Sequence, residues 1–87
     1  MKIDEQKLML ILNTFADVYP YFLPLEKFQE LSNDVGGEAK FDGHLLYLKE
    51  KGLIISDMKW NFDQQAYELS VGETRISSFG LDYLAGM

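Results

Sequence analysis

The sequence predicts a single α+β domain in which three helices precede a two-stranded hairpin. In the first half of the chain, apolar residues recur at helical spacing, whereas after Gly52 they alternate with the period of a strand. Turn-forming residues separate these segments, most clearly over residues 32–37. At 87 residues, 47% of them hydrophobic, the chain can bury one core of its own.

Residues 1–19 are expected to form the first helix, with acidic residues in its first turn. One face of this helix is apolar, through Leu8, Ile11, Leu12, Phe15 and Tyr19. Met9 and Leu10 fall outside that face, so the helix is apolar on more than one side. The second face has two interpretations: it packs under a C-terminal helix of the same chain, or it forms a seam with a second copy.

The connection after this helix contains two prolines, in the stretch Tyr-Pro-Tyr-Phe-Leu-Pro at residues 19–24. Residues 21–23 are expected to form a short strand, and Pro24 suits the first turn of the next helix. That second helix is predicted over residues 25–32, with Leu25, Phe28 and Leu31 facing inward. The composition of residues 32–37 predicts a turn.

A third helix is predicted over residues 38–51, and its end has a clear signal. If Gly52 adopts the left-handed conformation, Leu53 can pack back on Leu48 in a Schellman ending. The face of this helix toward the core should be Phe41, Leu45 and Leu48. The whole core is expected to include Phe28, Leu31, Phe41, Leu45, Leu48, Leu53, Ile76 and Leu81.

The period-two segment predicts a hairpin with its tip at residues 61–65. The outgoing strand places Ile54, Ser56, Met58 and Trp60 on one face, and the returning strand alternates through Tyr67, Leu69 and Val71. The alternation slips at Gly72, which indicates a bulge or tight turn. A short helix follows, with Leu81 and Leu84 inward. This order of elements is that of a winged helix-turn-helix, in which a short strand joins a two-stranded wing.

Two segments carry a resemblance to a known group. Residues 41–54, Phe-Asp-Gly-His-Leu-Leu-Tyr-Leu-Lys-Glu-Lys-Gly-Leu-Ile, resemble the join between recognition helix and wing in winged-helix regulators such as the multidrug-resistance repressors. Residues 67–84 resemble the Ile-Ser/Thr-x-x-Gly-x-x-Tyr/Phe-Leu ending that follows the wing in the same group. Together they are most similar to small prophage-associated winged-helix families of the YjcQ type.

The resemblance covers most of the chain and implies a fold, but it transfers no settled activity. The resemblance implies that residues 1–87 form one winged-helix domain. In longer members of such families more helical sequence follows the wing, so the domain is either the whole protein or the N-terminal part of a longer one.

Composition narrows the function. Fourteen acidic residues against eight basic ones give a formal charge of −6, which disfavours nucleic acid as a partner because that affinity comes largely from basic groups. The chain has no cysteine and one histidine, so we expect no disulfide, metal or cofactor. Without an apolar run of membrane-spanning length or a secretory leader, we expect a cytoplasmic protein with no membrane partner.

The outward face of the third helix is expected to be Asp42, Gly43, Leu46, Tyr47 and Glu50. A DNA-reading helix would carry basic or amide side chains there, whereas acids meet the phosphates with the wrong sign. Leu46 and Tyr47 are therefore candidates for protein contact. Met9 and Leu10, on the second apolar face of the first helix, are candidates as well. The alternative for Leu46 and Tyr47 is that the N-terminal segment or the wing covers them.

The rival hypothesis is a DNA-binding transcriptional regulator that uses helix 38–51 and the wing. Its contact candidates are Lys40, Lys49, Lys51 and Arg75, and the alternative for these lysines is an ordinary solvated face.

Other chemistry has little support in the sequence. His44 is expected to be a partly buried, hydrogen-bonded residue rather than a ligand, because no second histidine or cysteine is present. Trp60 and Phe62 either pack across the hairpin or stack on a partner. No nucleophile motif or phosphate loop is present, so we expect no enzyme and no small-molecule substrate. The leading hypothesis is a non-enzymatic winged-helix module that acts through a protein partner, a second copy of itself, or both.

Overall fold

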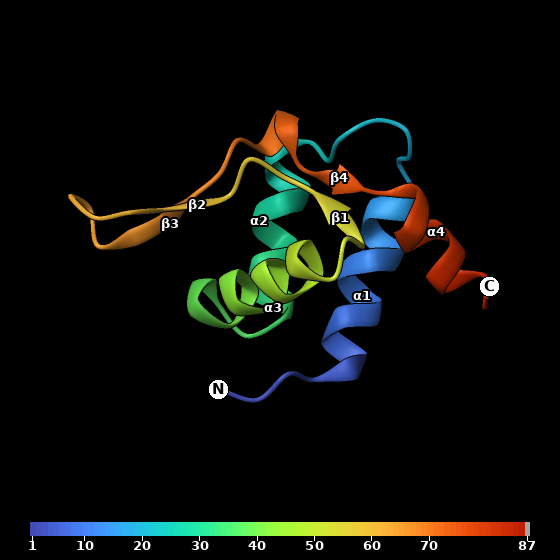
Figure 1. Cartoon of the computed structure of the whole chain (residues 1–87), viewed down its shortest axis with the longest axis horizontal. Coiled ribbons are helices and arrows are strands. Elements are labelled where there is room, and N and C mark those ends of the chain that lie inside the picture. The colour runs from blue at the N-terminus through green and yellow to red at the C-terminus, as the bar shows by residue number, and fades with distance from the viewer. Residues whose placement is uncertain (87) are drawn as a thin grey trace.

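This computed structural model describes residues 1–86, which form an α+β domain of four α-helices and two small antiparallel sheets. The elements are α1 (Glu5–Ala16), α2 (Leu25–Asp34), α3 (Glu38–Glu50), β1 (Ile54–Ile55), β2 (Lys59–Asn61), β3 (Ala66–Glu68), the 3₁₀ turn η1 (Val71–Glu73), β4 (Arg75–Ile76) and α4 (Ser78–Leu84). Figure 1 shows α1, α2 and α3 grouped together, with the β2–β3 hairpin projecting on one side and α4 on the other. Among residues 1–86, no helix is both long and apolar enough to cross a membrane.

The first helix is shorter than the expected range of residues 1–19 at both ends. Asp4 is its N-cap, and the carboxylate accepts hydrogen bonds from the backbone N–H groups of Gln6 and Lys7, so residues 1–4 form an arm outside the helix. After Ala16 the backbone tightens, since Tyr19 N–H donates to the Ala16 carbonyl at 3.2 Å. The chain then turns away through residues 17–20.

The strand expected over residues 21–23 does not form. The partner of β1 is β4, with Ile54 opposite Ile76 and Ile55 opposite Arg75. β4 is the segment that returns from the hairpin, so it reaches β1 as an antiparallel neighbour. Leu23 is nevertheless buried, as an anchor for the connection between α1 and α2.

The second helix is longer than expected, and one of its residues points elsewhere. α2 continues to Asp34, and Val35 beyond it is fully buried. Leu25 was expected to face inward but is 57% exposed. The reason is geometric: Leu25 and the buried Leu31 are six residues apart, which rotates Leu25 about 120° around the helix axis.

The end of α3 is the Schellman ending that the sequence predicts. Gly52 has a φ of +77°, and its N–H donates to the Lys49 carbonyl at 2.9 Å. Leu53 N–H donates to the Leu48 carbonyl, also at 2.9 Å. These bonds turn the chain directly from α3 into β1.

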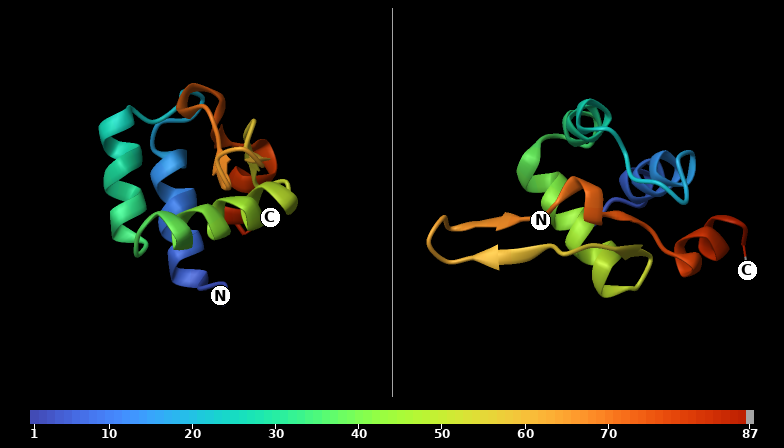
Figure 2. Two further views of the ribbon diagram at one scale, coloured as in Figure 1. Left: turned by 90° about the vertical axis from the view of Figure 1, so that its left-hand side faces the viewer. Right: turned by 90° about the horizontal axis from the view of Figure 1, so that it is seen from above.

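The predicted core is confirmed. Leu31, Phe41, Leu45, Leu48 and Ile76 are each at most 2% exposed, and the other expected members are half-buried against them, namely Phe28, Leu53 and Leu81. α4 packs on α1 and β4 at the opposite side of the molecule from the hairpin (Figure 2).

The predicted hairpin is divided into two short sheets. β1 pairs with β4 and β2 pairs with β3, and polar side chains accept hydrogen bonds from backbone N–H groups in the connections between them. Ser56 Oγ accepts from Met58 N–H at 3.1 Å, and Asp57 accepts from Ser70 N–H at 2.7 Å. Hydrogen bonding to Ser70 lowers the pKa of Asp57. The slip expected at Gly72 is the tight turn η1.

Candidate functional site: a groove between two helices and the hairpin

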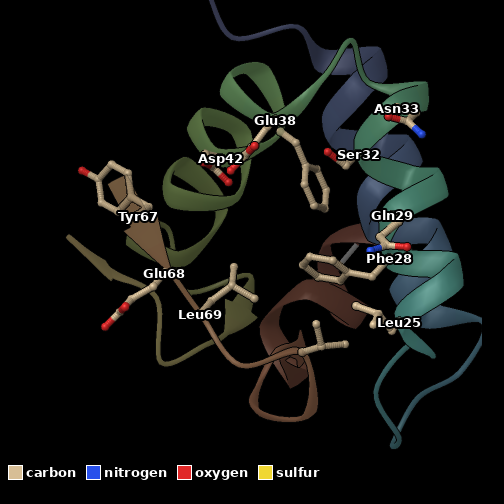
Figure 3. A pocket seen from close by; sticks show the side chains of 12 residues that line it. Leu25, Phe28, Gln29, Ser32, Asn33, Glu38, Asp42, Tyr67, Glu68 and Leu69 are labelled. Atoms are coloured by element: carbon tan, nitrogen blue, oxygen red, sulfur yellow. The ribbon is translucent and has the colours of Figure 1, made fainter. Parts of the chain in front are cut away.

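A groove of about 630 Å³ lies between α2, α3 and the returning half of the hairpin (Figure 3). We refer to it as the hairpin groove. Its lining consists of Leu25, Phe28, Gln29, Ser32, Asn33, Glu38, Phe41, Asp42, Tyr67, Glu68, Leu69 and Val71. α2 and α3 supply two of its walls and the segment from β3 to η1 supplies the third.

The floor of the hairpin groove is apolar. Phe28 packs edge-on against the buried Phe41, with ring centroids 5.1 Å apart, so the core holds it in place. Leu69 and Val71 approach from the hairpin and are half-buried. Leu25 stays 57% exposed at one end. This floor offers an occupant an apolar surface that the protein itself does not cover.

The α3 wall of the groove is acidic. Glu38 and Asp42 are four residues apart and therefore share one helical face, and Figure 3 shows their carboxylates side by side. Within the described residues, neither carboxylate has a hydrogen-bond or ion-pair partner, and no lysine or arginine lines the groove. Glu68 differs, because it pairs with Lys59 at 3.7 Å and accepts a hydrogen bond from Asn61.

The surroundings of Asp42 disfavour its charged form. Partial burial raises the pKa of Asp42, and repulsion from Glu38 raises it further. A positive group in the groove would counter the repulsion from Glu38 and replace some of the lost solvation. The wall is therefore better suited to a cation than to solvent alone.

Asp42→Asn is expected to raise the free energy of unfolding at neutral pH. The folded-state pKa of Asp42 lies above 3.8, so ionisation opposes folding at neutral pH, and this opposition fades as the pH falls through the folded pKa. Urea denaturation at neutral pH should show the gain in stability of the variant, and denaturation below pH 3.8 should show that this gain is lost. Asp63→Asn at the hairpin tip is the control. A variant less stable than the parent at neutral pH would contradict this account of Asp42.

A second hollow, of about 480 Å³, adjoins the first along α3. Glu38, Asp42 and Tyr67 line both, so the two hollows share part of their walls. Trp60 lines the second hollow and stands opposite Tyr67 in the hairpin, with ring centroids 5.1 Å apart. Trp60 therefore packs across the strands, which was one of its two interpretations, whereas Phe62 near the tip is 78% exposed.

The expected outward face of α3 is more covered than the sequence predicts. Leu46 and Tyr47 are half-buried and pack against the core, and of that face only Glu50 is exposed. The N-terminal arm covers part of it, because Met1 lies so close to Gly43 that a side chain there would collide with it. Tyr47 also lines a small hollow with Tyr83 of α4.

The other protein-contact candidates lie on α1. Met9 is half-buried and Leu10 is 41% exposed, so α4 does not fully cover this face. Self-association through Leu10 stays a prediction, which sedimentation at increasing protein concentration tests. A monomer at every concentration would remove it.

The DNA-contact candidates are spread over α3, the residue that follows it and β4. Lys49 Nζ donates to the Met58 carbonyl at 2.7 Å, which ties α3 to the hairpin, and Lys51 lies over the Tyr47 ring. Arg75 is half-buried in β4. Lys40 is exposed near the start of α3, about 16 Å along the helix axis from Lys51.

His44 is a structural residue. It is 1% exposed, its Nε2 accepts a hydrogen bond from Asp4 N–H at 3.0 Å, and its Nδ1 is 2.7 Å from the Lys40 carbonyl. Because Nε2 accepts, Nδ1 carries the proton and donates. Both nitrogens are occupied in anchoring the N-terminal arm to α3. In the described part of the chain, no group of three potential ligand side chains is arranged to hold a metal ion.

Sequence reasoning did not identify the hairpin groove. Glu38 and Asp42 at helical spacing were a local signal for the acidic wall, but nothing local placed Tyr67 or Leu69 opposite them. Searches against family models, curated proteins and solved structures find no match to this chain.

Proposed function

We propose that this protein is a non-enzymatic winged-helix module that acts through protein contacts made in the hairpin groove. In this proposal α2 and α3 are the helix-turn-helix pair and the β2–β3 hairpin is the wing. The observation that carries it is the unpaired acidic wall of Glu38 and Asp42 on the helix that would otherwise read DNA. Phosphates approaching this wall would meet like charge.

The alternative is a DNA-binding regulator, and one feature favours it. A hollow of about 620 Å³ beside the N-terminal arm is lined by Lys2, Lys7 and Lys40, close to the start of α3. These lysines could contact phosphates and so position the domain on a duplex while other side chains read its bases. The acidic wall nearby opposes such a complex, so we rank it second.

A duplex-binding measurement separates the two functions. We expect a pooled genomic duplex library to show no sequence-selective binding at about 50 mM salt, a condition that still favours electrostatic contacts. Submicromolar selective binding that Lys40→Ala weakens would refute the proposal and establish the alternative. Lys27→Ala is the matched control, because Lys27 is an exposed lysine of α2 outside both the groove and the arm hollow.

A further inference from the structure

We infer that the hairpin groove binds a basic protein segment, which places an arginine or lysine against Glu38 and Asp42 and an apolar side chain over the floor near Leu25. The inference rests on the proposed function, since it names the kind of partner for the same groove. It follows from the chemistry of the two ends of the groove and from the length of the α2 wall.

The first anchor of the bound segment is its arginine or lysine, and the charge of the groove is the reason for it. Glu38 and Asp42 repel each other and have no positive partner among the described residues, while the chain as a whole carries a formal charge of −6. The partly buried carboxylate of Asp42 attracts a cation more strongly than a fully solvated carboxylate does, because water screens it less, and the exposed carboxylate of Glu38 adds to this attraction. Tyr67 lines the same hollow and adds an aromatic face, which suits a guanidinium group.

The second anchor of the bound segment is its apolar side chain, and the exposed apolar surface near Leu25 is the reason for it. Leu25 is 57% exposed, and Phe28 and Val71 beside it are half-buried. The apolar surface continues past the groove, since Phe22 is 52% exposed and its ring lies 3.9 Å from the position of a Cβ on Gly72. An apolar side chain at this end would remove surface from water that the protein leaves uncovered.

The length of the groove favours an extended peptide. Asn33 and Leu25 both line the groove and lie eight residues apart on α2, so the wall that α2 supplies is about 12 Å long. Figure 3 shows Glu38 and Leu25 at opposite ends of the opening. An extended chain covers about 12 Å in three or four residues, so the basic and apolar residues should be separated by that spacing.

Synthetic peptides test the inference directly. The probes are fluorescent peptides with an arginine and a leucine at that spacing, matched peptides with glutamate for arginine or serine for leucine, and a set with the two residues adjacent. Fluorescence anisotropy with the full chain should show saturable binding of the first set. Loss of either anchor residue should weaken binding roughly tenfold.

Variants of the protein locate the binding. Glu38→Gln combined with Asp42→Asn should weaken binding of the arginine peptide roughly tenfold, and Leu25→Ser should weaken it less. The charge control is Asp63→Asn combined with Asp82→Asn, which changes the net charge equally outside the groove. The apolar control is Phe79→Ser, at a residue of α4 that is 69% exposed.

The outcomes distinguish this inference from the proposed function. Equal binding of the glutamate and arginine peptides, no binding of any peptide, or equal loss in the charge controls would overturn the basic segment as the occupant. These results would leave a protein partner of different chemistry in place. Selective duplex binding through Lys40 would instead remove the proposed function itself.

Discussion

Leu45→Ala is expected to lower the free energy of unfolding by about 2–5 kcal/mol, the range for removing a buried leucine side chain. Leu45 is 0% exposed in the middle of α3, within the cluster that joins α1, α3 and β4. The loss combines the transfer of apolar surface with a cavity that rigid neighbours cannot fill. Urea denaturation followed by circular dichroism measures it.

Leu10→Ala is the control for this substitution, since Leu10 is also a helical leucine but is 41% exposed. Its effect should stay below about 1 kcal/mol, as is usual for surface substitutions. If both variants lost the same stability, the packing of α3 described above would be wrong.

Gly80→Ala is expected to destabilise the docking of α4 by about 1–3 kcal/mol or more, the range for overpacking a filled site. Gly80 is buried, and a Cβ there would collide with the backbone carbonyl oxygen of Leu53 and with the side chain of Ile76. The carbonyl cannot move easily, because it accepts a hydrogen bond from Ser77 N–H at 3.1 Å. Ser77 Oγ also caps α4 through Gly80 N–H.

Gly72→Ala is the matched control for Gly80. A Cβ on Gly72 would meet nothing closer than the Phe22 ring at 3.9 Å, which is ordinary contact. Thermal unfolding of the two variants should therefore give a much lower midpoint for Gly80→Ala only. Equal midpoints would contradict the close packing of α4 against the β1–β4 pair.

Helical spacing and capping residues were sufficient to predict the core face of α3 and the way in which α3 ends. The core face of α3 follows from helical spacing, and its ending follows from Gly52 and the apolar pair Leu48 and Leu53. The start of α1 was misplaced although its signal was present, because Asp4 serves as the N-cap and not as a first-turn residue.

Contacts between distant segments explain what sequence reasoning missed. Residues 21–23 have the composition of a strand, but β4 is the partner of β1. Leu46 and Tyr47 lie on the expected face of α3, yet they pack against the core. The hairpin groove likewise depends on where the β2–β3 hairpin lies relative to α2, which no periodicity encodes.

Amide NMR spectra of the nitrogen-labelled protein provide the most direct test of the acidic groove as a protein-docking site. The protein would be titrated separately with the arginine–leucine peptide and with pooled duplex DNA at about 50 mM salt. We predict that the peptide shifts the amide signals of Glu38, Asp42 and Leu69 and that the duplex leaves them unchanged. Duplex-induced shifts along α3, with no response to the peptide, would contradict the account.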